Sequence, residues 1–201
     1  MIRNIVFDMG GVLVEFRPKA FLEELGFAPE ALNGVYETMF RSPLWLELDR
    51  GTYTFEEAVP LFIKMSPHLE AEIRQVLNVP KDKMLSPMEG SAEFLIDLKK
   101  QGYRIFVLSN FTQEGFAAIK QHYDYIHYVD EAVISSDIHM MKPEPEIYTY
   151  MLEKLKIRPE ETIFIDDLEV NLAPARALGI HTVQFTTLDE VKEKVGALLH
   201  G

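Results

Sequence analysis

Short apolar runs that end in small or polar residues alternate along this chain with longer amphipathic segments, and this alternation most constrains the fold. Aliphatic and β-branched runs of this kind are typical of buried parallel strands. We expect strands at residues 2–7, 104–108, 132–134, 162–165 and 180–184. Helical spacing is found over residues 91–101, 112–122, 145–155 and 170–178. The pattern predicts an α/β fold with a doubly wound parallel sheet, in which ligands bind at the carboxyl ends of the strands.

The stretch from Phe16 to Met84 breaks this alternation. It has the pattern of consecutive helices, interrupted at Gly26, Pro29, Pro43, Gly51, Pro67 and Pro80. We interpret residues 16–84 as an inserted helical cap and residues 1–15 and 85–201 as the core domain. Small residues at 10–11 and 86–90 would then lie near the hinges, where they can absorb the backbone changes of opening and closing.

The composition excludes several classes of function. The chain has 0 cysteines, which excludes disulfides, zinc–thiolate sites and thiol nucleophiles. Its formal net charge of -12 repels nucleic acids and anionic membranes, so we expect neither as a partner. The apolar runs are too short to span a bilayer, and no signal segment opens the chain, so we expect a cytoplasmic location. The same negative charge would repel a phosphorylated substrate, so a site for such a substrate would need a local cation.

Carboxylates follow two of the predicted strands. Asp8 comes directly after the first strand and before a pair of glycines, and Asp166 and Asp167 follow the fourth. A lone aspartate at such a position often caps a turn. Two adjacent carboxylates at the end of an apolar strand are costly unless protons or a divalent cation compensate them.

A hydroxyl, an amide and a lysine follow other predicted strands. Ser109 and Asn110 end the second strand just before Thr112, a suitable residue to cap the next helix. Lys142 precedes Pro143, whose ring favours an extended backbone before it. Helix capping alone would explain the polar residues Ser109, Asn110 and Thr112, and a lone lysine such as Lys142 is usually exposed to solvent. Alternatively, hydroxyl, amide and ammonium groups together suit the oxygens of an anion.

These four strand-end signatures, in this order and spacing, resemble the four motifs of the haloacid dehalogenase (HAD) superfamily, and the resemblance covers essentially the whole chain. The helical insertion is similar to the cap of the subgroup that contains haloacid dehalogenases, β-phosphoglucomutase and many small-molecule phosphatases. The resemblance implies that Asp8 is a nucleophile that becomes transiently phosphorylated. It also implies Mg²⁺ as the cofactor, held by Asp8, the carbonyl of Gly10 and Asp167, with Asp166 as a further ligand or a partner of metal-bound water.

The resemblance further implies that Ser109, the amide of Asn110 and Lys142 bind the phosphoryl oxygens. Asn171 would orient the loop that carries the fourth motif, although a hydrogen bond near a helix start would equally explain it. The expected reaction is the hydrolysis of a small phosphate monoester, a sugar phosphate or a similar metabolite.

The first motif departs from the usual phosphatase pattern. Most HAD phosphatases carry a second aspartate two residues after the nucleophile, which protonates the leaving group, and here that position is Gly10. Sugar-phosphatase-like members of the superfamily resemble this chain in having Asp-x-Gly. The best candidate region for a substitute acid or for substrate contacts includes Trp45, Asp49 and Arg50, although a helix end with a glycine cap also explains this segment.

Three alternatives remain open. A haloacid dehalogenase would use the same nucleophile without a metal, but the pair Asp166 and Asp167 would be uncompensated in such a site. A phosphomutase relies on an acid/base that Gly10 lacks. A non-catalytic phosphate-binding protein would have kept the scaffold without turnover. The pattern does not indicate an oligomeric state.

Overall fold

The centre of the molecule is a five-stranded parallel sheet. The computed structural model describes residues 1–200. The strands are β1 (Asn4–Phe7), β4 (Arg104–Ser109), β5 (Glu131–Ile134), β6 (Thr162–Asp166) and β7 (His181–Gln184). They lie in the order β5-β4-β1-β6-β7, and every neighbouring pair is parallel. The chain therefore starts in the middle of the sheet and extends it in both directions, which confirms the doubly wound fold.

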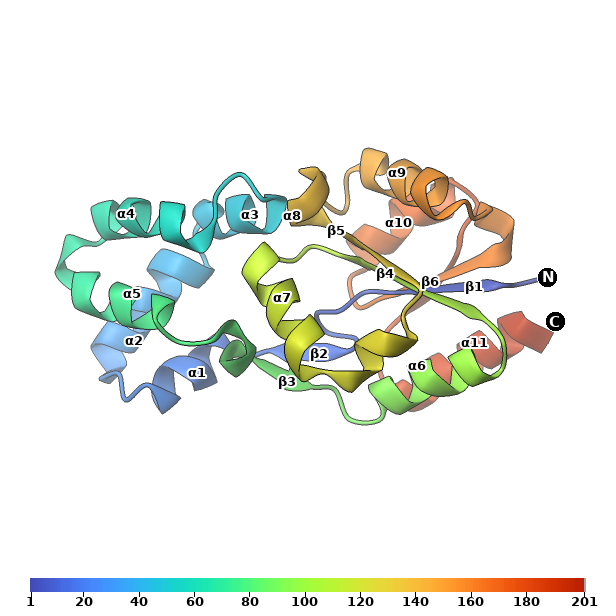
Figure 1. Cartoon of the computed structure of the whole chain (residues 1–201), viewed down its shortest axis with the longest axis horizontal. Coiled ribbons are helices and arrows are strands. Elements are labelled where there is room, and N and C mark those ends of the chain that lie inside the picture. Colours follow the sequence, from blue (N-terminus) through green and yellow to red (C-terminus); the bar gives the residue numbers. More distant parts are fainter. Residues whose placement is uncertain (201) are drawn as a thin grey trace.

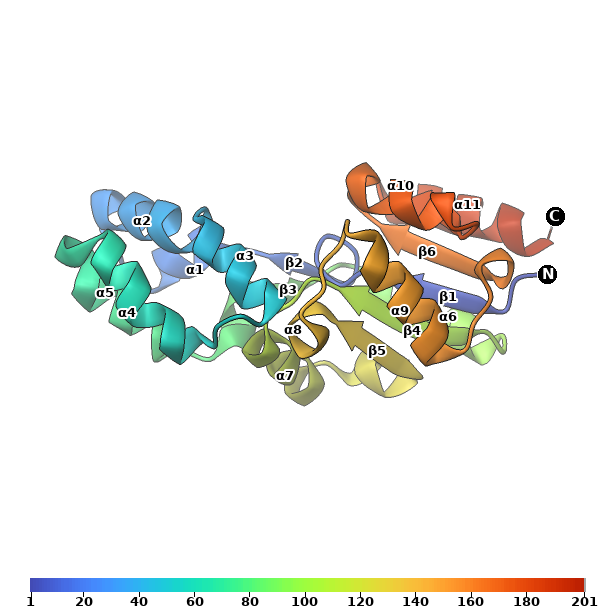
Figure 2. The same ribbon diagram turned by 90° about the horizontal axis from the view of Figure 1, so that it is seen from above.

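Helices cover both faces of the sheet (Figures 1 and 2). One face packs on α6 (Ser91–Lys100), α7 (Gln113–His122) and α11 (Leu188–His200), and the other on α9 (Pro145–Leu155) and α10 (Glu169–Ala177). Within β1, Ile5 and Phe7 face the first layer and Val6 the second, as alternation along a strand requires. Among the described helices, none is long and apolar enough to cross a bilayer.

A separate group of helices forms between β1 and β4, at the end of the sheet where these strands stop (Figure 1). Its α-helices are α1 (Pro18–Glu24), α2 (Pro29–Val35), α3 (Pro43–Arg50), α4 (Phe55–Met65) and α5 (Glu70–Leu77). A π-helix follows α2 at Tyr36–Phe40, and 3₁₀ turns lie at Pro67–Leu69 and Lys81–Met84. These helices bury a hydrophobic cluster of their own, which extends from Phe21 to Met84. The expected helical insertion is therefore present.

Proline and glycine set several helix boundaries in this insertion. Prolines begin α1, α2 and α3, where a missing N–H costs no helical hydrogen bond. Gly51 ends α3 with a φ of 79°, a conformation that favours glycine. Pro60, by contrast, lies inside α4.

Two short strands connect the insertion to the sheet domain. β2 (Val14–Phe16) pairs antiparallel with β3 (Leu85–Pro87). This ribbon could not be predicted from the sequence, because three-residue strands are too short to show an alternating pattern. The two crossings between the core and the insertion are thus held side by side. A further short helix, α8 (Ser135–Ile138), follows β5 directly.

Candidate active site

The carboxylate of Asp8 lies at the carboxyl end of the central strand β1. Its Oδ1 atom accepts hydrogen bonds from Ser109 Oγ and from the backbone N–H of Met9, both at 2.7 Å. The ammonium of Lys142 lies 2.9 Å from the same oxygen. No residue from 1 to 200 donates a hydrogen bond to Oδ2. One oxygen of Asp8 is therefore fixed, while the other remains available to attack or to bind a cation.

Lys142 connects the first and fourth motifs. Its Nζ atom lies 2.6 Å from Oδ2 of Asp166 as well as 2.9 Å from Asp8, and its side chain is only 1% exposed. The backbone of Lys142 is held by the side chain of Asn110, which donates to its carbonyl and accepts from its N–H, both at 2.8 Å. Asn110, just after β4, thus positions the lysine, and both polar atoms of its side chain are used in these two hydrogen bonds.

Asp166 is fully buried and its oxygens already have partners. Oδ1 accepts from the N–H of Leu168 at 2.9 Å and from the amide of Asn171 at 3.0 Å, and Oδ2 accepts from Lys142 and Asn171. Asn171 is itself fixed from behind, because Tyr148 donates to its carbonyl at 2.6 Å. Asp166 and Asn171 therefore orient the loop after β6 and hold Lys142 toward Asp8.

Asp167 completes a cluster of three carboxylates. Asp8, Asp166 and Asp167 each offer an oxygen within 4.8 Å of the others. Asp167 lies against the left-handed turn at Gly11, where an added Cβ would be 2.6 Å from its Cγ. Three carboxylates facing one ammonium, that of Lys142, leave an excess of negative charge. Clustered carboxylate oxygens are the ligands that hard divalent cations prefer, so this cluster fits Mg²⁺.

The pKa values of two of these carboxyls, those of Asp8 and Asp167, reflect their burial. Burial raises the pKa of Asp8 to about 6, although Lys142 opposes the shift, and the negative charge of Asp166 adds to it. The pKa of Asp167 is raised as well, first by burial and then by Asp166. Without a cation, these carboxyls tend to hold protons instead, as buried like charges do.

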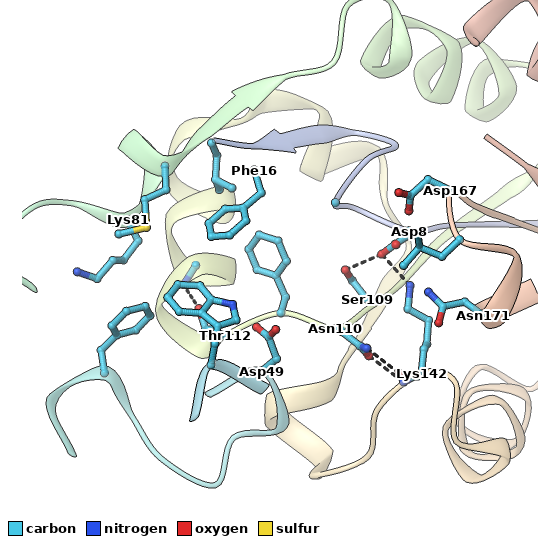
Figure 3. A pocket seen from close by; sticks show the side chains of 18 residues that line it. Asp8, Phe16, Asp49, Lys81, Ser109, Asn110, Thr112, Lys142, Asp167 and Asn171 are labelled. Carbon is cyan, nitrogen blue, oxygen red and sulfur yellow. Dashed lines mark hydrogen bonds and ion pairs between the residues drawn. The ribbon is translucent and has the colours of Figure 1, made fainter. Parts of the chain in front are cut away.

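A cavity of about 290 Å³ opens from this cluster toward the cap. Asp8, Asp167, Lys142 and Ser109 lie together on one side of it in Figure 3. Aromatic rings line much of the remainder, from the ribbon, the cap and the loop after β4: Phe16, Trp45, Phe55 and Phe111. The cavity thus combines a charged end with a largely apolar wall.

The three cap residues singled out from the sequence lie in different places. Trp45 lines the cavity and also packs on the rings of Phe16 and Phe40, so it serves both the cap core and the cavity wall. Asp49 lines the cavity too, and burial raises its pKa to about 7. Arg50 is not among the lining residues. Its guanidinium forms a bidentate ion pair with Glu144 of the core.

Several residues of the site could not be recognised in the sequence. The rings of Phe16, Phe55 and Phe111 belong to elements far apart in the chain, and in the sequence they match the pattern of ordinary core positions. Ser135 and Glu144 contact the cap through hydrogen bonds that span 86 and 94 residues. Such distant pairs leave no local signal.

The chain matches the family of haloacid dehalogenase-like hydrolases over residues 2–179. It therefore belongs to this family.

Curated relatives of the chain include proteins with different activities. Mouse bifunctional epoxide hydrolase 2 is 29% identical over 90% of this chain, and the match covers 36% of the mouse protein, so the chain spans about a third of that relative. D-ribitol-5-phosphate phosphatase of Bacteroides thetaiotaomicron is 26% identical over 92% of both chains. (S)-2-haloacid dehalogenase 4A of Burkholderia cepacia is 26% identical over 91% of this chain and 82% of its own length.

A solved structure has the same fold over nearly its whole length. It is a HAD family enzyme from Bacteroides thetaiotaomicron in complex with magnesium and inorganic phosphate. Its TM-score is 0.73 at 24% identity, and the alignment covers 94% of this chain and 98% of that one.

Proposed function

We propose that this chain is a magnesium-dependent phosphohydrolase that cleaves a small phosphate monoester through a phospho-aspartyl intermediate on Asp8. The observation that carries the proposal is the arrangement around Asp8. Hydrogen bonds and Lys142 hold one carboxylate oxygen, while the other has no donor among the described residues and the side chain lines the cavity. A carboxylate fixed in this way is suited to attack a phosphorus atom in line.

The neighbouring groups then bind the phosphoryl oxygens. The hydroxyl of Ser109 and the ammonium of Lys142 already converge within 2.9 Å of Asp8 Oδ1, so they lie close to any group that Asp8 attacks. Together with the backbone amide of Asn110, they would stabilise the charge that spreads over these oxygens in the transition state. Because the side chain of Asn110 holds Lys142, we assign its role in binding to the backbone alone.

Asp8, Asp167 and the carbonyl of Gly10 would hold the magnesium ion, since all three residues line the cavity. Asp166 does not line it and acts through Lys142 and Asn171 instead. When bound, the ion supplies positive charge between the nucleophile and the phosphoryl group. The excess of carboxylates in the cluster supports this assignment, as does the structurally similar enzyme solved with magnesium and phosphate.

The lining of the cavity favours a substrate whose organic group is largely apolar. Besides the four rings, most of the polar groups near the wall have partners of their own. Lys81 donates to the carbonyls of Val76 and Leu77 at the end of α5 and to that of Val79 just after it, and Thr112 caps α7. Few groups remain to bind sugar hydroxyls. We therefore expect a lower KM for n-butyl phosphate than for ribitol 5-phosphate, and the reverse order would contradict this preference.

Hydrolysis of p-nitrophenyl phosphate tests the proposed function, because this leaving group hardly needs protonation. We expect release of p-nitrophenol that requires Mg²⁺, stops with EDTA, and falls by at least about 10³-fold in Asp8→Asn. No turnover above the Asp8→Asn control would instead favour a non-catalytic phosphate-binding protein.

The related dehalogenase makes a second assay necessary. The chain is incubated with 2-chloropropionate in the presence and absence of EDTA, and chloride is measured. The phosphohydrolase proposal predicts no release above the Asp8→Asn control. Release of chloride that persists in EDTA would overturn it.

A further inference from the structure

The position two residues after the nucleophile is open space. Gly10 lines the cavity, and a Cβ added there would meet no atom within 4 Å. A carboxyl at this position would lie in the cavity that Asp8 lines, but glycine offers none. A substrate with a high leaving-group pKa then needs another proton donor, and any donor that the chain itself supplies must be another residue of the cavity.

The ionisable residues that line the cavity leave one candidate. They are Asp8, Asp49, Lys81, Lys142 and Asp167. Asp8 and Lys142 form the nucleophile and its partner, Asp167 faces the cation site, and the amine of Lys81 is occupied by carbonyl groups. Asp49 remains, and its carboxylate has no hydrogen-bond partner among the residues that the structure describes.

The backbone of Asp49 is anchored to the loop that carries Ser109. The carbonyl of Asp49 accepts a hydrogen bond from the hydroxyl of Ser135. The same hydroxyl accepts a hydrogen bond from the N–H of Phe111 at 2.9 Å, two residues after Ser109. One buried hydroxyl therefore joins the end of α3 to the phosphate-binding loop.

The residues after Asp49 dock against the core as well. The guanidinium of Arg50 pairs with Glu144, whose carboxylate accepts from the N–H of Met141 beside Lys142. Gly51 lies so close to α8 that an added Cβ would be 2.8 Å from the Cα of Ser136. The segment 49–51 is thus fixed to the loops of the second and third motifs. Figure 3 shows the Asp49 carboxylate pointing into the cavity on the side of Asn110.

The pKa of Asp49 is suited to a residue that donates a proton near neutral pH. Burial raises the pKa of its carboxyl from 3.8 to about 7. A substantial fraction of the carboxyl therefore carries a proton near neutral pH, where acid catalysis is most effective with a pKa close to the ambient pH.

We propose that Asp49 of the cap is the general acid of the reaction, in place of the aspartate that Gly10 lacks. This inference rests on the proposed function. As Asp8 Oδ2 forms its bond to phosphorus, the bond from phosphorus to the ester oxygen breaks. The carboxyl of Asp49 gives its proton to that oxygen, and the alcohol leaves. Water then attacks phosphorus, the bond to Asp8 breaks, the proton of the water returns to Asp49, and inorganic phosphate is released.

The test compares two substrates that differ in their need for protonation. The value of kcat/KM is measured for n-butyl phosphate and for p-nitrophenyl phosphate with wild type and Asp49→Asn, because this constant reports phosphoryl transfer to Asp8 and not the later hydrolysis. We expect Asp49→Asn to lower kcat/KM about 10²–10³-fold for n-butyl phosphate and less than about fivefold for p-nitrophenyl phosphate. Glu56→Gln, which removes an exposed carboxylate from the same cap, should change neither value.

Equal losses on both substrates would mean that Asp49 only positions other groups, and would overturn the proposal, as would an unchanged rate on n-butyl phosphate. Melting temperatures of both variants identify any loss that is due to unfolding. Failure of the proposed function would look different from failure of the role of Asp49, because wild type itself would then hydrolyse neither substrate.

Discussion

At the scale of single residues, Lys142 supplies the positive charge that offsets the repulsion between the buried carboxylates of Asp8 and Asp166. Its ammonium lies within 3 Å of both Asp8 and Asp166. We expect Lys142→Met to lower the free energy of unfolding by about 3 kcal/mol at pH 8, because two buried carboxylates lose their partner. The loss should be smaller at pH 5, because burial raises the pKa of Asp8 to about 6 and its carboxyl takes up a proton there. Urea denaturation at both pH values measures this difference.

The control is Lys100→Met, which changes an exposed lysine. Equal losses for Lys142→Met at both pH values would contradict the proposed pairing of Lys142 with charged carboxylates.

The raised pKa of Asp49 has a consequence for stability that is independent of activity. Because the folded protein binds this proton more tightly than the unfolded chain does, the carboxyl stabilises the fold fully below its ordinary pKa of 3.8. That contribution disappears as the pH rises through about 7. Between pH 5 and pH 8, wild type should therefore lose on the order of 2–3 kcal/mol more than Asp49→Asn does. Parallel stability curves for the two proteins would contradict the raised pKa.

Residues in a local motif were predictable, and residues that work through distant contacts were not. Asp8, Ser109, Lys142 and Asp167 follow strands whose carboxyl ends meet at one edge of the sheet, so their order in the sequence already predicts their meeting. The partner of Arg50 was not predictable, because Glu144 lies 94 residues away in the sequence.

At the scale of elements, the turn after α3 decides how the cap meets the core. Gly51 has a positive φ and lies against the backbone of Ser136. Gly51→Ala should lower the free energy of unfolding by about 1–3 kcal/mol and raise KM, because the segment 49–51 must move away from the core. Gly196→Ala is the matched change, since Gly196 lies within α11 with no atom within 4 Å of an added Cβ. We expect Gly196→Ala to raise the free energy of unfolding by roughly 0.5–1 kcal/mol. Destabilisation of similar size in both variants would contradict the proposed close contact.

The five strands of the main sheet and the helical insertion follow from periodicity and from the helix-breaking residues. The ribbon of β2 and β3 does not, because each strand has only three residues and its partner lies about 70 positions away. It nevertheless places Phe16 in the wall of the cavity.

At the scale of the whole molecule, the cap and the core are joined by polar contacts across the cavity. Arg50 pairs with Glu144, and Glu114 of α7 accepts a hydrogen bond from the N–H of Phe55 at the start of α4, at 2.9 Å. These contacts hold the cap over the cavity, although the sequence indicated only that a cap exists.

Because the ion pair of Arg50 is partly exposed, it should affect closure more than stability. Arg50→Met should raise KM by about 3–10-fold at low salt and lower the free energy of unfolding by no more than about 1 kcal/mol. The KM of wild type should approach that of the variant as salt screens the pair. Arg158→Met, which removes an exposed pair on the core, should leave KM unchanged. A KM for Arg50→Met equal to that of wild type at low salt would exclude this role in closure.

Trapping the phosphorylated aspartate tests directly whether Asp8 is the nucleophile. Wild type is quenched during turnover of p-nitrophenyl phosphate with Mg²⁺ and treated with tritiated borohydride, which reduces an acyl phosphate to an alcohol, and the labelled peptide is sequenced. If Asp8 is the nucleophile, we expect tritium at residue 8, converted from aspartate to homoserine, and no label in Asp8→Asn or in wild type without substrate. Turnover without label at residue 8, or with label at another carboxylate, would contradict it.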